Sequence, residues 1–101
     1  METDEYVVVI GSAGLDIRAR SQEILTDGIP GAGVVRQSVG GVARNIAENL
    51  ARLEVPTILL TALGHDLSGQ RVLRNCRRAG IDCQYLQQIE GERTGTYVAL
   101  Q

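Results

Sequence analysis

The sequence predicts an α/β fold built on a parallel β-sheet, and two observations lead to that class. Two short runs, residues 6–10 and 57–62, are rich in β-branched and other apolar side chains, which is typical of buried strands. Between them, residues 42–55 carry apolar side chains at helical spacing. Strands connected through a helix lie parallel in one sheet, with a right-handed crossover. The 101 residues, 44% of them apolar, are enough for one domain with its own core.

Strands and glycine-rich turns are predicted to alternate in the first part of the chain. The run 6–10 leads into Gly11–Gly14, which we expect to be a turn. Leu15–Arg20 alternates apolar and polar residues, which predicts a second strand with one wet face. Gly, Pro, Thr and Asp dominate residues 21–33, so we expect a loop there. Gly33–Val39 is predicted to be extended again, and a glycine pair ends it.

A helix is predicted to begin at Val42. Glu48 and Arg52 form an acid-before-base i,i+4 pair on its polar side. Pro56 is expected to end the helix, because the residue before a proline leaves the α region. The predicted apolar face consists of Ala43, Ile46, Ala47, Leu50, Ala51 and Leu53.

The second half repeats the strand and helix pattern. After the run 57–62, a turn at Gly64–Gly69 leads into a helix with Gly80 as its C′ residue. Cys83–Ile89 and Thr94–Gln101 are predicted strands, and we expect them to pair as a hairpin. The predicted apolar face of the second helix consists of Leu67, Val72, Leu73, Cys76 and Ala79. A last strand at the chain end leaves an uncovered sheet edge, so we expect a truncated chain or a partner that completes the fold.

The composition excludes several classes of function. All ten basic residues are Arg, so a Walker A loop or a lysine Schiff base is not expected. A single His, His65, argues against multi-histidine zinc sites. The net charge of −2 and the absence of Phe and Trp disfavour nucleic-acid binding. No apolar stretch approaches a membrane span of about 18–20 residues, so no membrane partner is expected.

The cysteines and the N-terminus indicate a reducing compartment. Cys76 and Cys83 match no usual zinc spacing and do not form a disulfide framework, so we expect free thiols. The acidic start lacks the basic region of a secretory signal. We therefore expect a cytoplasmic protein.

The first candidate for ligand binding is Gly11–Asp16, a glycine turn followed by an acid. Gly14 and its neighbours let a ligand approach the backbone, and Asp16 could accept hydrogen bonds from a vicinal diol. The alternative is a tight turn with a surface acid. Ala13 stands where a dinucleotide fingerprint needs glycine, which disfavours a Rossmann domain.

The second candidate is Gly40–Asn45, where two glycines open a helix. The free N–H groups of the first turn are expected to face a ligand. Asn45 can both donate and accept hydrogen bonds, and Arg44 adds a fixed cation. The alternative is a flexible helix entry with Asn45 as a local cap.

Three further features are weaker. Asp66 or Ser68 is expected to cap the following helix, with His65 solvated. Gly31–Gly33 resembles an anion hole, but we interpret it as part of a loop. Within Arg93–Tyr97, the hydroxyls of Thr94, Thr96 and Tyr97 could contact a ligand or pair across strands.

The order of these motifs resembles the N-terminal part of the PfkB-type, or ribokinase-like, sugar and nucleoside kinases. The resemblance runs from Tyr6 to Gln101 and is most specific over residues 40–53, which are most similar to the pseudouridine kinase branch. It implies a three-layer α/β/α sandwich, of which this chain is the N-terminal part, with a small β-sheet lid. The single partial domain would comprise core segments at about 6–14 and 40–83 and lid strands at about 15–39 and 84–101.

The resemblance also implies residue roles. Asp16 and Asn45 would hold sugar hydroxyls, and Gly40 and Gly41 would offer backbone N–H groups; Gly14, Arg44 and Thr96 complete the expected substrate contacts. Gly14 replaces an Asn that is frequent in the family, and Glu54 replaces a helix-ending Gly. Val42 replaces a Lys of ribokinases proper, which argues against ribose itself, and the similarity over residues 40–53 favours a pseudouridine-like acceptor.

The activity implied for a complete protein is transfer of the γ-phosphoryl group of Mg-ATP to a sugar hydroxyl. The family's catalytic Asp and its ATP and metal contacts lie further downstream, so we assign no catalytic or metal-binding residue here. ATP and Mg²⁺ are implied partners of a complete protein, and neither is expected to bind this chain alone. A homodimer through the lid strands is also implied. The alternative function is a non-catalytic small-molecule-binding or oligomerisation module.

Overall fold

The computed structural model describes residues 5–22, 28 and 31–101. The loop predicted over residues 21–33 lies largely outside the described residues. The elements are, in order, β1 (Val7–Ile10), β2 (Gly14–Ser21), β3 (Gly33–Gly40), α1 (Val42–Arg52), β4 (Thr57–Leu60), β5 (Ala62–Gly64), α2 (Leu67–Arg78), β6 (Gln87–Ile89) and β7 (Thr96–Leu100).

The core lies between two parallel strands and the two helices. β1 pairs with β4 in parallel, with Val9 opposite Leu59, which confirms the predicted parallel sheet. Both helices contribute to one apolar cluster, through Ala47 of α1 and Val72 and Cys76 of α2. These three side chains are fully buried, as expected for small residues where a helix packs closely on a sheet.

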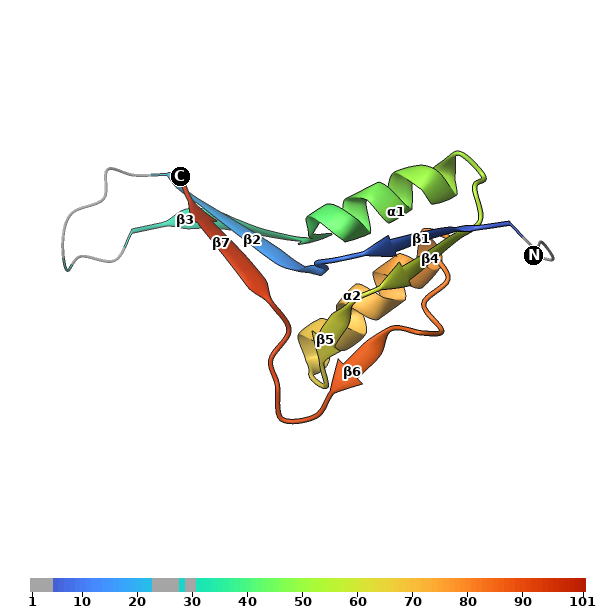
Figure 1. Ribbon diagram of the computed structural model, residues 1–101. Helices are drawn as coiled ribbons and strands as arrows, with labels where there is room; N and C mark the ends of the chain where they lie inside the picture. The colour runs from blue at the N-terminus through green and yellow to red at the C-terminus, as the bar shows by residue number, and fades with distance from the viewer. Residues whose placement is uncertain (1–4, 23–27, 29–30) are drawn as a thin grey trace.

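A separate three-stranded sheet extends away from this core, as Figure 1 shows. β2 is its central strand, antiparallel to β3 and parallel to β7. The predicted strands over 15–20 and 33–39 are confirmed. The period-two alternation gives this sheet one polar face with Asp16 and Arg18, and one apolar face with Leu15 and Ile17.

The predicted hairpin between residues 83–89 and 94–101 is wrong. β6 is shorter than expected and pairs in parallel with β5, whereas β7 joins β2 in the other sheet. The Asp82 carboxylate accepts a hydrogen bond from the Gln84 backbone N–H at 3.0 Å, and this local turn keeps residues 83–86 out of a strand.

Three smaller expectations also change. Leu67 is 82% exposed and is not part of the apolar face of α2. It is the first residue of the helix, directly after the cap, and lies outside the core cluster. The strand predicted over 57–62 is interrupted at Thr61 and continues as β5. β1 was expected to be buried, but Ile10 is 76% exposed, because no described element covers that face of β1.

None of the described helices is long and apolar enough to cross a membrane.

Candidate functional site

Asp16 lies where the three-stranded sheet meets the start of α1. It occupies the third position of β2, in register with Ser38 of β3. A Cβ atom on Gly40 would stand only 2.3 Å from Asp16 Oδ2, so the carboxylate lies directly against the Gly40 backbone. No other residue type fits at position 40 without displacing this carboxylate. Within the described residues, the Asp16 side chain has no hydrogen-bond or ion-pair partner.

The turn at Gly11–Gly14 packs against the first turn of α1. Gly41 is the N-cap with φ +103°, a backbone conformation that favours glycine, and a Cβ there would lie 2.5 Å from Ser12 O. The backbone N–H of Arg44 donates to Ser12 O at 3.1 Å, and that of Val42 donates to Ser12 Oγ at 3.2 Å. Two donors that we expected to be free are therefore bonded to Ser12, and the alternative of an Asn45 side-chain cap is not observed. The two glycine motifs form one structural unit.

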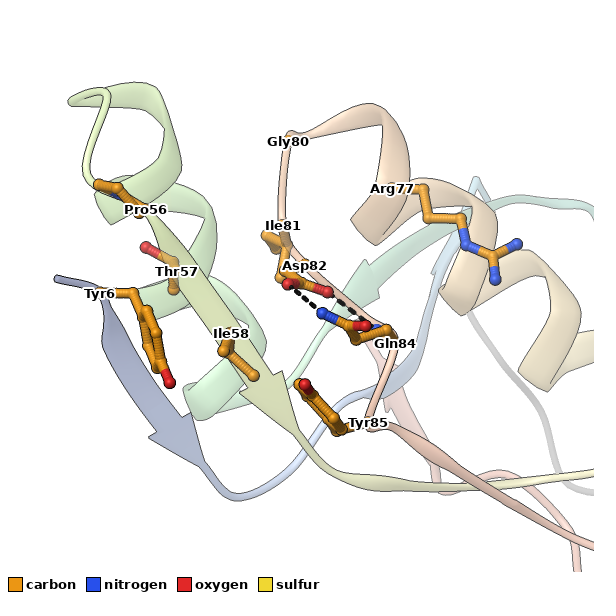
Figure 2. Close-up of a pocket in the computed structure, with 10 residues that line it drawn as sticks. All are labelled: Tyr6, Pro56, Thr57, Ile58, Arg77, Gly80, Ile81, Asp82, Gln84 and Tyr85. Atoms are coloured by element: carbon orange, nitrogen blue, oxygen red, sulfur yellow. Dashed lines mark hydrogen bonds between the residues drawn. The ribbon is translucent and has the colours of Figure 1, made fainter. Parts of the chain in front are cut away.

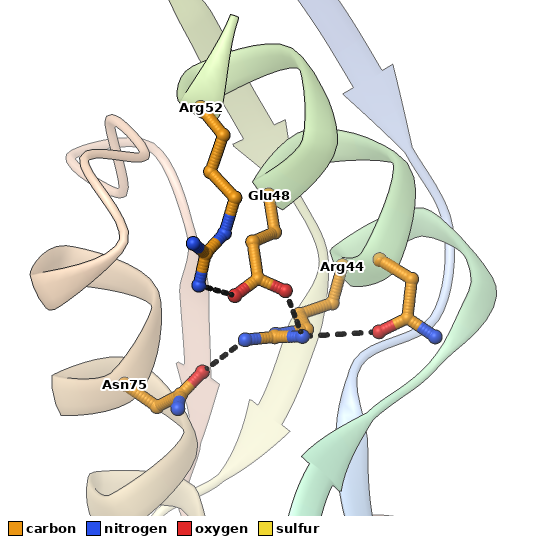
Figure 3. Close-up of polar contacts among 5 residues, drawn as sticks. Arg44, Glu48, Arg52 and Asn75 are labelled. Carbon is orange, nitrogen blue, oxygen red and sulfur yellow. Dashed lines mark hydrogen bonds and ion pairs between the residues drawn. The ribbon is translucent and has the colours of Figure 1, made fainter.

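Arg44 is held inside a polar network between the two helices, which Figure 3 shows. Its side chain donates to Asn45 Oδ1 at 3.1 Å, to Glu48 Oε2 at 2.9 Å and to Asn75 Oδ1 at 2.6 Å. Arg44 is only 6% exposed. Asn45 Oδ1 accepts from Arg44, and the Asn45 amide nitrogen keeps its own capacity to donate. The structure thus gives Arg44 a role in orienting Asn45.

Glu48 joins this network to the surface. It accepts a hydrogen bond from Arg52 at 3.1 Å, which confirms the predicted i,i+4 pair. The hydrogen bond from Arg52 and the neighbouring charge of Arg44 hold the pKa of the Glu48 carboxyl below its usual value. Glu48 therefore stays ionised and compensates the charge of the buried Arg44.

Asp66 caps α2, as predicted, and also fixes the chain that leads into β7. Its Oδ1 accepts from the Gly69 N–H at 2.7 Å and from the Thr94 hydroxyl at 2.7 Å, and its Oδ2 accepts from the Thr94 N–H at 2.9 Å. These hydrogen bonds from Thr94, followed by that from Gly69, lower the pKa of the Asp66 carboxyl. The hydroxyl of Thr94 is buried in this structural contact, so it is not available to a ligand. The sequence offered no signal for this pairing across 28 residues.

The register of β7 determines which of its side chains face Asp16. Tyr97 is opposite Asp16, whereas Thr96 is opposite Leu15. Registered partners in a parallel pair share a face, so Tyr97 lies on the Asp16 face and Thr96 on the other face. Gly14 allows the chain at Gly95 to approach β2 closely, because a Cβ atom at position 14 would lie 2.4 Å from Gly95 O.

Residues further along the Asp16 face were not among the candidates. Arg18, Arg20 and Arg36 line a cleft of about 720 Å³ over the polar face of this sheet. Arg18 and Arg36 are directly opposite each other in the β2–β3 register. The period-two alternation places Arg18 and Arg20 on the Asp16 face and could have identified them.

A further pocket, of about 530 Å³, lies at the amino ends of β1 and β4 and is drawn in Figure 2. Tyr6, Pro56 and Tyr85 line it, next to the hydrogen-bonded side chains of Asp82 and Gln84. In open α/β sheets, ligands bind outside the carboxyl ends of the strands. Gly11 and Asp16 follow the carboxyl end of β1, so we place the candidate site there.

The two cysteines are core residues. Cys76 is fully buried, as predicted, and Cys83 is 7% exposed. Both are free thiols, and the contact with Cys76 together with burial raises the pKa of Cys83. Neither residue contributes to the candidate site.

Comparisons with known proteins fit this arrangement. The profile of the pfkB family of carbohydrate kinases matches residues 4–101. Pseudouridine kinase of Escherichia coli (strain K12) is 38% identical over 100 residues, which cover 99% of this chain and 32% of that protein. The uncharacterized sugar kinase YeiI of the same strain is 38% identical over 96 residues, covering 95% and 26% of the two chains. The chain thus spans about a third or less of the length of these curated relatives.

Solved structures show the same fold. A putative sugar kinase from Clostridium perfringens has a TM-score of 0.91 and 33% identity, with 98% of this chain and 31% of that chain covered. Arabidopsis thaliana ribokinase, solved with ribose and ATP, has a TM-score of 0.85 and 26% identity, with 94% and 31% covered. These likenesses confirm the expected ribokinase-like α/β fold. The family profile, the relatives and the fold agree, and the chain belongs to the pfkB family of carbohydrate kinases.

Proposed function

We propose that this chain supplies the acceptor-binding part of an ATP-dependent sugar or nucleoside kinase, with a pseudouridine-like acceptor. The observation that carries the proposal is the Asp16 carboxylate, which lies against Gly40 and has no partner among the described residues. An ionised carboxylate is acceptor-only and pairs well with two adjacent hydroxyls. The similarity to pseudouridine kinase of E. coli supports the choice of acceptor.

Asn45 and the backbone at Gly40–Gly41 complete the acceptor site. The Asn45 amide is oriented by Arg44, which itself is fixed by Glu48 and Asn75. A ring with several hydroxyls would donate to Asp16 and accept from the Asn45 amide nitrogen. Tyr97 lies on the same face of the sheet and could cover the ring from β7.

The sheet β3-β2-β7 would act as a lid over the acceptor, and its apolar face would pair with that of a second subunit. Val35, Val98 and Leu100 are exposed on this face, which supports such a contact. Closure of a lid excludes water from the reacting groups.

We assign no contact of this chain to ATP or Mg²⁺ and derive no transfer step. Within the described residues, no group of three or more His, Cys, Asp or Glu side chains that could hold a metal ion is found. The proposed contribution of this chain is to bind and orient the acceptor hydroxyls.

The test is a kinase assay on the complete gene product, with ATP and pseudouridine, uridine, inosine or ribose as acceptor. Asp16→Ala and Asn45→Ala are each expected to lower kcat/KM by about 10- to 100-fold, the effect of losing one or two charge-assisted or neutral hydrogen bonds. Glu90→Gln, an exposed carboxylate on the turn after β6, is the control and should leave kcat/KM unchanged. Unchanged kcat/KM in both site variants would contradict the site, and absence of ATP-dependent turnover with every acceptor would contradict the proposed function.

A further inference from the structure

A second cleft, of about 640 Å³, lies between β3 and the two helices. None of Asp16, Gly40, Gly41 and Asn45 lines it, and it shares with the acceptor site only Arg44, which orients Asn45. Four arginines line it, Arg44 from α1 and Arg71, Arg74 and Arg78 from α2, together with a single acid, Glu48.

The positive charge of this cleft is not compensated by the described residues. Glu48 is already shared between Arg44 and Arg52, and these are the ion pairs found in that part of the chain. Arg71 donates to the neutral side-chain oxygen of Gln37 on β3. Arg74 and Arg78 have no acidic partner among the described residues.

The spacing of these arginines on α2 is unfavourable in the absence of an anion. Arg74 and Arg78 are four residues apart and Arg71 and Arg74 three, so like charges share one face of the helix. Like charges at i,i+4 destabilise a helix by a few tenths of a kcal/mol, roughly. In a concave surface they also focus a positive potential. A bound anion would remove this repulsion.

Arg44 forms the buried inner side of the cleft and carries one polar atom that is unpartnered in the described part of the chain. Arg44 is 6% exposed, and within the described residues its Nε has no hydrogen-bond partner. Its two terminal nitrogens are fixed by three acceptors, so the cation has one geometry, as Figure 3 shows. Buried polar groups without a partner are uncommon and call for an explanation.

From these observations we propose that the cleft binds the phosphate group of a small phosphorylated metabolite. Guanidinium groups match phosphate oxygens through paired N–H donors, and Arg71, Arg74 and Arg78 present three of them on one helix face. The volume falls in the range of small-molecule sites, about 300–1,000 Å³. Among the described residues, no aromatic side chain lines the cleft, which fits a phosphate or sugar phosphate better than a stacked base.

The test uses this chain in phosphate-free chloride buffer at fixed ionic strength, with calorimetry and thermal unfolding as readouts. The probes are inorganic phosphate and ribose 5-phosphate, and ribose is the uncharged control. We expect saturable binding of at least one phosphate probe and a rise in Tm with it. Tighter binding of ribose 5-phosphate identifies a phosphate ester as the ligand, and tighter binding of inorganic phosphate identifies the free anion.

The double variant Arg74→Gln/Arg78→Gln should weaken phosphate binding at least tenfold. Arg77→Gln is the matched control, because Arg77 is exposed on the same helix but lines the pocket at the amino ends of β1 and β4. Its affinity should change less than twofold. Circular dichroism of each variant without ligand verifies the fold. The three substituted residues, Arg74, Arg77 and Arg78, are exposed, so the variants should fold. The inference is overturned by absence of saturable binding of both phosphate probes, or by equal losses in the double variant and in Arg77→Gln. Since no kinase turnover is measured, this result is independent of the proposed function.

Discussion

Replacing Thr94 with valine removes one buried hydroxyl and keeps the shape of the side chain. Thr94 is 5% exposed, and its hydroxyl donates to Asp66 Oδ1 at 2.7 Å and accepts from the Gly64 N–H at 3.0 Å. This residue connects the cap of α2 to the chain that enters β7. The variant therefore tests the contact that places β7 beside β2 and Asp16.

The expected loss of stability follows from these two hydrogen bonds. Gly64 is buried, so its N–H would lose its partner at a cost of about 1–3 kcal/mol. The hydrogen bond to Asp66 is lost as well, but this carboxylate is partly exposed and can accept from water instead. We therefore expect a total loss of about 1–3 kcal/mol, dominated by the buried Gly64 N–H. For a chain of this size, each kcal/mol lowers Tm by about 4–8 °C.

The assay is urea and thermal unfolding followed by circular dichroism. Thr96→Val is the matched control, since Thr96 is exposed and, within the described residues, its hydroxyl donates only to Thr94 O at 3.2 Å. Its stability should change by less than about 0.5 kcal/mol, as is usual for surface substitutions. Equal losses in the two variants, or a loss below about 1 kcal/mol for Thr94→Val, would refute the reasoning.

The pH dependence of the unfolding free energy tests the contact between Asp66 and Thr94 independently. The pKa of the Asp66 carboxyl is lowered from its ordinary value of 3.8, chiefly by the hydrogen bonds from Thr94. A lowered folded-state pKa contributes stability above the unfolded-state pKa, and this is lost as the pH falls through the folded-state pKa. In Thr94→Val the Asp66 pKa should move back toward 3.8, so the loss of stability between about pH 6 and pH 3 should shrink. An unchanged pH dependence would contradict the assignment.

Three further predictions concern other parts of the chain. Glu54 has φ +62° after α1, where a β-carbon is strained, so Glu54→Gly should raise the free energy of unfolding by about 0.5–1 kcal/mol; a loss of stability in urea unfolding would contradict this. Gly40→Ala places a Cβ 2.3 Å from Asp16 Oδ2 and should weaken acceptor binding at least tenfold in calorimetry; unchanged affinity would remove Asp16 from the site. The hydrogen bond from Arg52 is the main cause of the lowered pKa of Glu48, so the stability that Glu48 contributes is lost as the pH falls below its ordinary pKa of 4.5. Glu48→Gln should therefore reduce the loss of unfolding free energy measured between about pH 6 and pH 4. A plot of unfolding free energy against pH that runs parallel to that of the original chain would contradict this.

The parts of the fold that the sequence predicted correctly rest on periodicity and local stops. Residues 42–52 carry the helical period, and the proline at position 56 limits how far that helix can extend. The alternation over 15–20 identified a half-exposed strand, because side chains in a strand point to opposite faces in turn. The cap at Asp66 is a local contact, with its Gly69 donor three residues away, and it was also correctly identified.

The candidate site was predicted in its residue types but not in its contacts. Asp16 and Gly40 come from different motifs, and only the β2–β3 register brings them together. The sequence favoured Arg44 as a ligand contact, whereas the folded chain engages it with Asn45, Glu48 and Asn75. Asn75 is 31 residues from Arg44, and no local pattern links them.

What the sequence determined by itself is the two helices, the strands over 15–20 and 33–39 and the cap at Asp66, because these follow from interactions within a few residues along the chain. Tertiary structure alone decided the partners of the last two strands. β6 pairs with β5, and β7 pairs with β2. The Asp66 carboxylate accepts two hydrogen bonds from Thr94, and this contact separates β7 from β6 so that the two strands do not form a hairpin. Hydrogen bonds between residues about 30 positions apart, and the burial of Arg44 between two helices, arise only when the elements pack. Such long-range contacts leave no periodic trace in a single sequence, because each depends on the register of a strand or the crossing of two helices.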